Sequence, residues 1–333
     1  MTLRKLAAFA LTALVFTTAA EAVPIDMVPV SNPGNAPDTR YNAIGFGSVG
    51  YNYQIGKYEV TAAQYTEFLN AAAKSDPNGL YDTAMGVPGS PSFGANIQRM
   101  GSSPNYSYDV AADWANRPVN FVDFWDAARF ANWLHNGQPT GPQGPSTTED
   151  GAYFNVGNQA TFARQAGARF FIPNEDEWYK AAYHNQSAGL AASYFDYPTG
   201  TNSLPGNNIN ETTKPGNNAN YRDGDSYTID IPYYRTVAGE FELSDSSYGT
   251  FDQGGNVWEW NETALASSSR GLRGGAFGAL VDSLHASARI NGPEPSNENL
   301  NFGFRVASSI PEPGSINLCV MGVLSLMLRR RTR

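Results

Sequence analysis

The side chains that most often carry out metal or nucleophilic chemistry are scarce in this sequence. Its 333 residues include one cysteine, Cys319, and three histidines, His135, His184 and His285. A soft metal such as Cu(I) is held by thiolate or thioether sulfur, and a thiol nucleophile requires a cysteine in the folded region. Cys319 lies in a C-terminal apolar tail, so the rest of the chain offers no disulfide and no thiolate metal site.

Oxygen atoms are the abundant potential ligands. The chain has 31 Asp and Glu against 22 Lys and Arg, a net charge of −9. Their spacing shows no pair typical of general acid–base catalysis. An acidic chain is a poor candidate for binding nucleic acid, because the phosphates would repel it. Carboxylate and carbonyl oxygens instead suit a hard cation such as Ca²⁺.

The start of the chain is predicted to be a targeting segment. Residues 1–22 begin with Arg4 and Lys5, continue with an apolar run over 6–16, and close with the small–x–small pattern Ala20-Glu21-Ala22. These three parts are typical of a secretory signal peptide. The alternative is a buried N-terminal helix.

The end of the chain, 311–333, is also predicted to be a targeting segment. It opens with Pro311-Glu312-Pro313, continues with an apolar run over 316–328, and closes with arginines up to Arg333. The apolar run is short for a span of about 20 residues, and the arginines after it would stay on the cytoplasmic side. This order resembles the PEP-CTERM sorting signal of Gram-negative bacteria.

That resemblance implies a transient inner-membrane anchor, an exosortase-type enzyme that removes the tail, and delivery to the cell surface or extracellular matrix. An ordinary C-terminal anchor is the alternative. The first segment carries a net charge of +1 and the last +3, so their removal would change the charge of the chain from −9 to −13.

Between these ends we expect a polar, Pro-rich leading segment at 23–40 and one mixed domain at 41–308. Alternation at Tyr51, Tyr53 and Ile55 predicts a strand, and Thr61 is placed to cap the helix that follows. A second helix is predicted near 127–134. Asn174 with Glu177 forms a capping-box pattern at the start of a third helix, after a short strand at 169–172.

Long polar stretches separate these elements. Residues 75–113, 136–152 and 186–250 are rich in Gly, Pro, Ser or Asn and are predicted to be loops. Three strand-like pieces follow at 254–260, 270–277 and 301–307. The fold class expected from this order is α+β, with little regular secondary structure.

Seven motifs occur in one order along this domain. They are G-K-Y-E-V-T-x-x-Q-Y-x-x-F, R-P-V-x-x-V, D-A-A-R-F-x-N-W-L, F-x-I-P-x-E-x-E-W, G-N-V-W-E-W, L-R-G-G and G-F-R. Each is weak alone, but the series closely resembles the formylglycine-generating enzyme family, also called the sulfatase-modifying-factor domain. The resemblance implies a loop-rich variant of the C-type lectin-like fold.

The family's activity would require residues that this sequence lacks. Its members oxidise a sulfatase cysteine to formylglycine with oxygen and a copper ion held by two cysteines. Alignment on R-G-G-A-F places those cysteines near Ala279 and Leu284, which cannot bind copper. His285 is nearby, but one imidazole does not make the site. The iron-dependent sulfoxide synthases of the same fold need a histidine cluster, which three scattered histidines do not supply.

The resemblance also implies calcium sites. In F-D-Q-G-G-N-V-W-E-W, the matching positions are the side chains of Asp252 and Glu259 and the carbonyls of Gly255 and Val257. The alternative is that Asp252 is a turn residue and that Glu259 bonds to the backbone.

A second implied site uses the side chains of Asn220 and Asp225 and the carbonyls of Tyr221 and Tyr227. The loop is longer here than in the family, so Asp223 or Asp230 could replace Asp225. The alternative is an Asp-Gly turn.

Other candidate groups have a structural and a functional interpretation. Four arginines near the last strands, Arg270, Arg273, Arg289 and Arg305, could form a patch for an anion or could pair inside the core with Asp282 or Glu262. We expect the tryptophans to anchor the core rather than to form a carbohydrate platform.

Together these observations favour an exported, non-catalytic binding or structural module of the extracellular matrix, with structural calcium and no copper. Its expected partners are an exosortase-type processing enzyme and extracellular polysaccharide or matrix protein. The alternative is a formylglycine-generating oxidase acting on a sulfatase cysteine.

Overall fold

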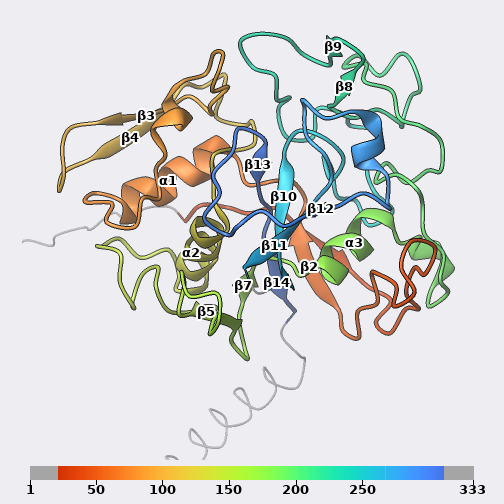
Figure 1. Cartoon of the computed structure of the whole chain (residues 1–333), viewed down its shortest axis with the longest axis horizontal. Helices are drawn as coiled ribbons and strands as arrows, with labels where there is room; N and C mark the ends of the chain where they lie inside the picture. Colours follow the sequence, from red (N-terminus) through yellow and green to blue (C-terminus); the bar gives the residue numbers. More distant parts are fainter. Residues whose placement is uncertain (1–21, 267, 311–333) are drawn as a thin grey trace, which may run out of the picture.

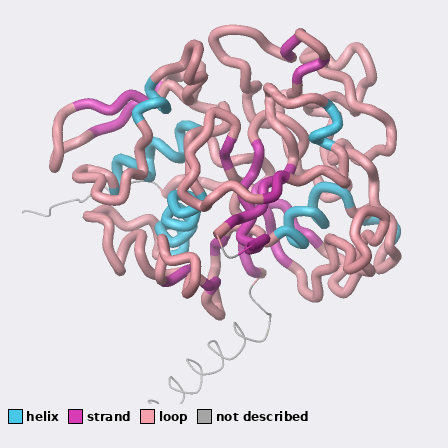
Figure 2. Tube along the Cα trace, viewed as in Figure 1, coloured by secondary structure: helices cyan, strands magenta, loops and turns pink. Residues whose placement is uncertain are grey.

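The computed structural model describes residues 22–266 and 268–310, which form an α+β fold of short elements joined by long loops (Figure 2). The α-helices within these residues are α1 (Ala62–Ala72), α2 (Phe124–His135) and α3 (Glu175–Tyr183). None of them is long and apolar enough to cross a membrane. The predicted signal peptide, the C-terminal sorting segment and Cys319 lie outside the described residues, except for Ala22.

Two four-stranded sheets occupy the centre of the molecule. One has the order β1-β2-β14-β7, formed by Met27–Val30, Tyr53–Gly56, Ala307–Ser309 and Phe170–Phe171. The other has the order β12-β11-β10-β13, formed by Ile290–Asn291, Ser269–Arg273, Trp258–Ala266 and Phe302–Gly303. In Figure 1 the strands run between α1 and α2 on the left and α3 on the right.

Both ends of the domain meet in the first sheet. β14 pairs antiparallel with both β2 and β7, so the last strand lies between a strand from the start of the domain and one from its middle. In the second sheet, β10 pairs antiparallel with β11 and parallel with β13. Its nine residues make β10 the longest strand described.

Two of the predicted helix starts are confirmed in detail. The Thr61 side chain accepts a hydrogen bond from the Gln64 N–H, and Gln64 returns one to the Thr61 backbone, which completes a capping box for α1. Asn174 and Glu177 form the same reciprocal pair at α3. The start of α2 is capped by Asp123, whose carboxylate accepts from the Asp126 N–H.

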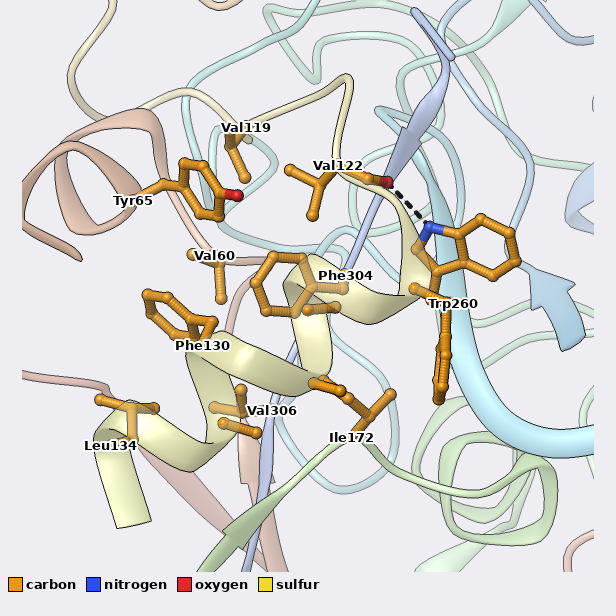
Figure 3. Packing of buried hydrophobic residues seen from close by; sticks show 14 of the residues in the cluster. Val60, Tyr65, Val119, Val122, Phe130, Leu134, Ile172, Trp260, Phe304 and Val306 are labelled. Atoms are coloured by element: carbon orange, nitrogen blue, oxygen red, sulfur yellow. Dashed lines mark hydrogen bonds between the residues drawn. The ribbon is translucent and has the colours of Figure 1, made fainter. Parts of the chain in front are cut away.

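The main core lies between α1, α2 and the central strands. Phe130 of α2 contacts Tyr65 of α1 and Phe304, with ring centroids 6.1 and 5.3 Å away. Trp260 of β10 is fully buried, and its indole N–H donates to the Val122 carbonyl at 2.9 Å (Figure 3). Trp125, Trp133, Trp178, Trp258 and Trp260 are all buried, which supports their expected role as core anchors.

The structure adds strands where loops were expected. The leading segment 23–40 contains β1, which pairs with β2 over Met27–Val30. The stretch 75–113 contains a hairpin of β3 (Ile97–Met100) and β4 (Ser107–Val110). The stretch 186–250 contains the short pair of β8 with β9 (Arg222–Asp223, Ser226–Tyr227), and β5 pairs with β6 (Tyr153–Phe154, Ala163–Arg164) in a stretch for which no element was predicted. Such short strands leave too little alternation to be detected in a polar sequence.

The loop over 293–301 is held against the start of α2. The Phe124 N–H donates to the Pro295 carbonyl at 2.8 Å, and the Phe121 N–H donates to the Asn299 carbonyl at 3.1 Å. In the same loop, burial and a hydrogen bond with Asp82 raise the pKa of Glu298 to about 9. Glu298 therefore holds its proton at neutral pH in the folded protein.

We expect Glu298→Gln to stabilise the protein at pH 8 but to have little effect near pH 4. The carboxyl stays protonated up to about pH 9 when folded but only up to about 4.5 when unfolded, so wild-type stability falls as pH rises through this window. Glutamine cannot ionise and removes that loss. The measurement is urea unfolding at both pH values, with Glu294→Gln, an exposed change in the same loop, as control. An equal effect of Glu298→Gln at both pH values would contradict it.

Candidate functional site

The loop before β10 places Asp252 at the edge of a small cavity. Asp252 Oδ2 accepts a hydrogen bond from the Gly239 N–H at 2.6 Å, and burial raises the pKa of this carboxyl to about 6. The cavity has a volume of about 10 Å³, and its wall includes Asn218 and Ser244. That volume corresponds to about one water molecule or ion surrounded by oxygen-bearing groups.

Glu259, on β10, is fully buried and already engaged. Its carboxylate accepts from Arg305 Nε at 2.6 Å and Nη2 at 2.7 Å, and from the Trp178 indole N–H at 2.7 Å. The expected alternative for this residue, a bond to the backbone, is not what the structure shows. A carboxylate has about four acceptor sites, so Glu259 retains one for a further ligand.

Glu59 is a site residue that the sequence interpretation missed. It lies between β2 and α1, it is 1% exposed, and neither of its carboxylate oxygens has a hydrogen-bond partner among the described residues. Burial, together with the charges of Asp252 and Glu259, raises its pKa far above the usual value. The available signal was the Glu in the quoted G-K-Y-E-V-T motif, where an acid stands among residues of a buried strand and helix start.

These carboxylates do not form a metal site by themselves. In residues 22–266 and 268–310, no three His, Cys, Asp or Glu side chains are grouped so that they could hold a metal ion. A cation beside Asp252 would therefore need backbone oxygens as well, which is the type of ligand expected from Gly255 and Val257. The uncompensated carboxylate of Glu59 fits such a cation, since buried charges are normally paired or bound to metal.

Asn220, from the second expected set, lies beside the first set. Its backbone bridges to Gly255, and its Nδ2 donates to the Tyr234 carbonyl at 3.0 Å and to Asn256 Oδ1 at 2.7 Å. Its Oδ1 is buried and has no partner within the described residues. The two expected sets thus meet at Asn220 and Gly255.

The other members of the second set lie elsewhere. Asp225 is exposed in the two-residue turn between β8 and β9, and the Tyr227 ring packs against Tyr234 with centroids 4.9 Å apart. The Tyr221 carbonyl accepts from the Thr228 hydroxyl at 3.1 Å. Asp223 and Asp230, the alternatives to Asp225, are also exposed. The structure groups Asn220 with Asn256 and the segment 234–236, and it leaves these three acids on the surface.

The two residues nearest to the aligned positions of the family's copper-binding cysteines, Ala279 and Leu284, have no metal-ligating side chain. Ala279 is partly exposed, and its carbonyl accepts from the Arg222 N–H at 2.8 Å. Leu284 is fully buried in an apolar cluster with Tyr197, Ala219 and Tyr221. Copper has no soft ligand at either position, so the residues do not fit that metal.

The arginines form ion pairs and backbone contacts instead of an anion patch. Arg273 and Arg289 both pair with Glu175, at 2.7 and 3.2 Å, and Arg305 pairs with Glu259. Arg270 donates to the Glu262 main-chain carbonyl. The core-pairing interpretation is therefore supported, but the principal partners are Glu175 and Glu259 rather than Asp282 and the Glu262 side chain.

A larger cavity opens beside this region. It has a volume of about 530 Å³ and lies between the loop at 204–214 and the β8–β9 hairpin. Val281, which lies between Ala279 and Leu284 in the sequence, contributes to the wall of this cavity. The hairpin and its loops are at the upper right of Figure 1.

Comparison with known proteins identifies the family of the described domain and proteins of similar structure. Residues 47–310 match the family described as the sulfatase-modifying factor enzyme 1-like domain. The crystal structure of CarF is similar, with 20% identity and a TM-score of 0.51, over 86% of this chain and 99% of that one. Treponema denticola variable protein 1 is similar, with 19% identity and a TM-score of 0.51, over 87% and 99%. No curated protein sequence gave a significant match.

We expect Arg305→Met to destabilise the protein by about 3–5 kcal/mol, because it leaves the Glu259 carboxylate buried without its partner. Lys74→Met is the control: this lysine is exposed and forms no ion pair within the described residues, so its loss should change the stability by no more than about 0.5 kcal/mol. The measurement is the free energy of unfolding in urea.

The double variant Glu259→Gln/Arg305→Met should be more stable than Arg305→Met alone, since it removes the unpaired charge. A double variant no more stable than Arg305→Met would mean that Arg305 acts through its backbone contacts and not through Glu259.

Proposed function

Because this chain belongs to the sulfatase-modifying factor enzyme 1-like family, we propose that it is a non-catalytic member that acts as an exported binding or structural module. The carrying observation is Leu284. Alignment on R-G-G-A-F places one of the family's copper-binding cysteines near it, and it is fully buried among Tyr197, Ala219 and Tyr221. A thiolate is absent there, and the other position is Ala279.

Calcium is the metal that the remaining residues suit. Asp252, the carbonyls of Gly255 and Val257, and the open acceptor site of Glu259 would hold it, with Glu59 as an additional buried carboxylate. Asn220 Oδ1, also buried and without a partner, is the group that remains from the second set. The ion would supply positive charge among these acids. The protein's own part is to hold the oxygens in place, which gives calcium a stabilising role.

Export and location are proposed from the sequence of the two ends. The predicted signal peptide at 1–22 and the PEP-CTERM-like segment at 311–333 would bring the chain across the inner membrane, with transient anchoring before an exosortase-type enzyme removes the tail. The resulting module would act at the cell surface or in the extracellular matrix, with polysaccharide or matrix protein as its partner.

We expect millimolar calcium to raise the thermal unfolding midpoint of the purified protein, since a ligand bound only by the folded state stabilises it. Asp252→Asn should abolish this shift, and Asp109→Asn, an exposed change on β4, should retain it. Asp225→Asn tests the second expected set, because its exposed position predicts no effect. An equal calcium shift in wild type and Asp252→Asn would contradict the proposed site.

The non-catalytic role is tested against the alternative of a formylglycine-generating oxidase, which family membership alone favours. The protein is incubated with oxygen, copper and a peptide carrying a sulfatase-type cysteine motif, and the peptide mass is followed with an active family member in parallel. We expect no conversion. Conversion to formylglycine would overturn the proposal.

Binding is tested by immobilising the processed protein and exposing it to the producing cell's extracellular fraction, first with calcium and then with EDTA. A matrix component retained with calcium and released by EDTA is the expected result. Failure to retain any polysaccharide or matrix protein would contradict the binding role.

A further inference from the structure

We propose that the 530 Å³ cavity between the loop at 204–214 and the β8–β9 hairpin binds a neutral saccharide. The inference rests on the proposed binding function and names its ligand class and its site. The volume lies within the range of about 300–1,000 Å³ typical of small-molecule pockets. The cavity is built largely from the Asn-rich stretch that the sequence indicated only as a loop.

The walls of the cavity are fixed by hydrogen bonds before any ligand arrives. Gly206 bridges to Asn218, and the buried Asn218 amide donates to the Thr213 and Lys214 carbonyls at 2.9 and 2.8 Å. The Tyr221 hydroxyl donates to the Pro205 carbonyl at 2.8 Å. A wall held in this way loses little conformational freedom on binding, which favours affinity.

The charges in the wall are balanced. The Lys214 ammonium keeps its positive charge while it donates to the Leu204 carbonyl at 2.7 Å and to the Pro205 carbonyl at 3.3 Å. Asp223 is exposed, its carboxylate accepts no hydrogen bond within the described part of the chain, and it supplies the opposite charge. One positive and one negative group give no net attraction for carboxylates, sulfates or phosphates, so the wall favours a neutral ligand.

The uncommitted polar groups match hydroxyl groups. Asp223 supplies acceptors only, whereas the Asn207 side chain supplies both donors and acceptors and, within the described residues, makes only a 3.5 Å contact to the Ser226 carbonyl. A sugar hydroxyl donates and accepts at once, so neighbouring hydroxyls can use the carboxylate and the amide together. An apolar ligand would leave both groups without partners, which carries a cost in free energy.

Apolar side chains complete the wall. Leu204 is 48% exposed, and Ile209 and Val281 lie beside it in the lining. They can cover the C–H face of a sugar ring while Asp223 and Asn207 bond its hydroxyls. This combination of apolar contact with a few placed polar groups is the general pattern of small-molecule sites.

The experiment is titration calorimetry with saturation-transfer NMR on the processed protein. The ligands are maltose, cellobiose, lactose, digalacturonate, and neutral oligosaccharides hydrolysed from the producing cell's own polysaccharide. We expect at least one neutral saccharide to bind, and digalacturonate to bind no more tightly than the neutral disaccharides. Asp223→Ala and Asn207→Ala should each weaken binding about tenfold or more, as expected for loss of a hydrogen bond to a charged or amide group.

Asp225→Ala is the matched control, because Asp225 is an exposed acid of the same hairpin and is not in the cavity wall. Failure of every neutral saccharide to bind, preference for digalacturonate, or equal losses in Asp223→Ala and Asp225→Ala would overturn the proposal. Capture of an amine-bearing peptide instead of a sugar would do the same.

The two proposals fail in different ways. Retention of a matrix protein without saccharide binding would leave the binding module intact and remove the saccharide site. Saccharide binding together with formylglycine production would keep the site and overturn the non-catalytic role.

Discussion

The buried ion pair between Arg305 and Glu259 is the interaction on which the rest of the domain depends. Both residues are 0% exposed. Such a pair is tolerable only if the remaining donors and acceptors are satisfied. Arg305 accordingly donates to the carbonyls of Gly56 and Phe251, and Glu259 accepts from Trp178. One pair thus connects β10, the end of β2, the loop before β10 and α3.

The same pair explains why the neighbouring carboxylates form a distinctive environment. Asp252 and Glu59 lie near Arg305, but Glu259 already neutralises the positive charge of that residue. Arg305 therefore cannot compensate all three acids. Burial is the main cause of the raised pKa values of Asp252 and Glu59, and the charges of the neighbouring acids add to it; the Glu59 oxygens have no hydrogen-bond partner within the described residues. A bound cation and a retained proton are the two ways to relieve this excess of negative charge.

The sequence predicted those features that depend on residues close together along the chain. The capping boxes at Thr61 and Asn174 need only residues three positions apart, and both form. The position of β1 and the role of Glu59 depend on partners far along the chain, β2 for one and Asp252 for the other. Asp225 was predicted as a calcium ligand only from its position in the family motif. That position did not show that a two-residue turn would hold the side chain at the surface.

The apolar cluster around Leu284 and the cavity share residues. Leu284 packs with Tyr221 and Val281, and both of these also line the cavity. The Tyr221 hydroxyl donates to the Pro205 carbonyl in the opposite wall. The apolar cluster around Leu284 therefore supports the loop at 204–214 through Tyr221. The buried leucine at 284 favours a rigid wall, which agrees with the proposed binding role of the loops.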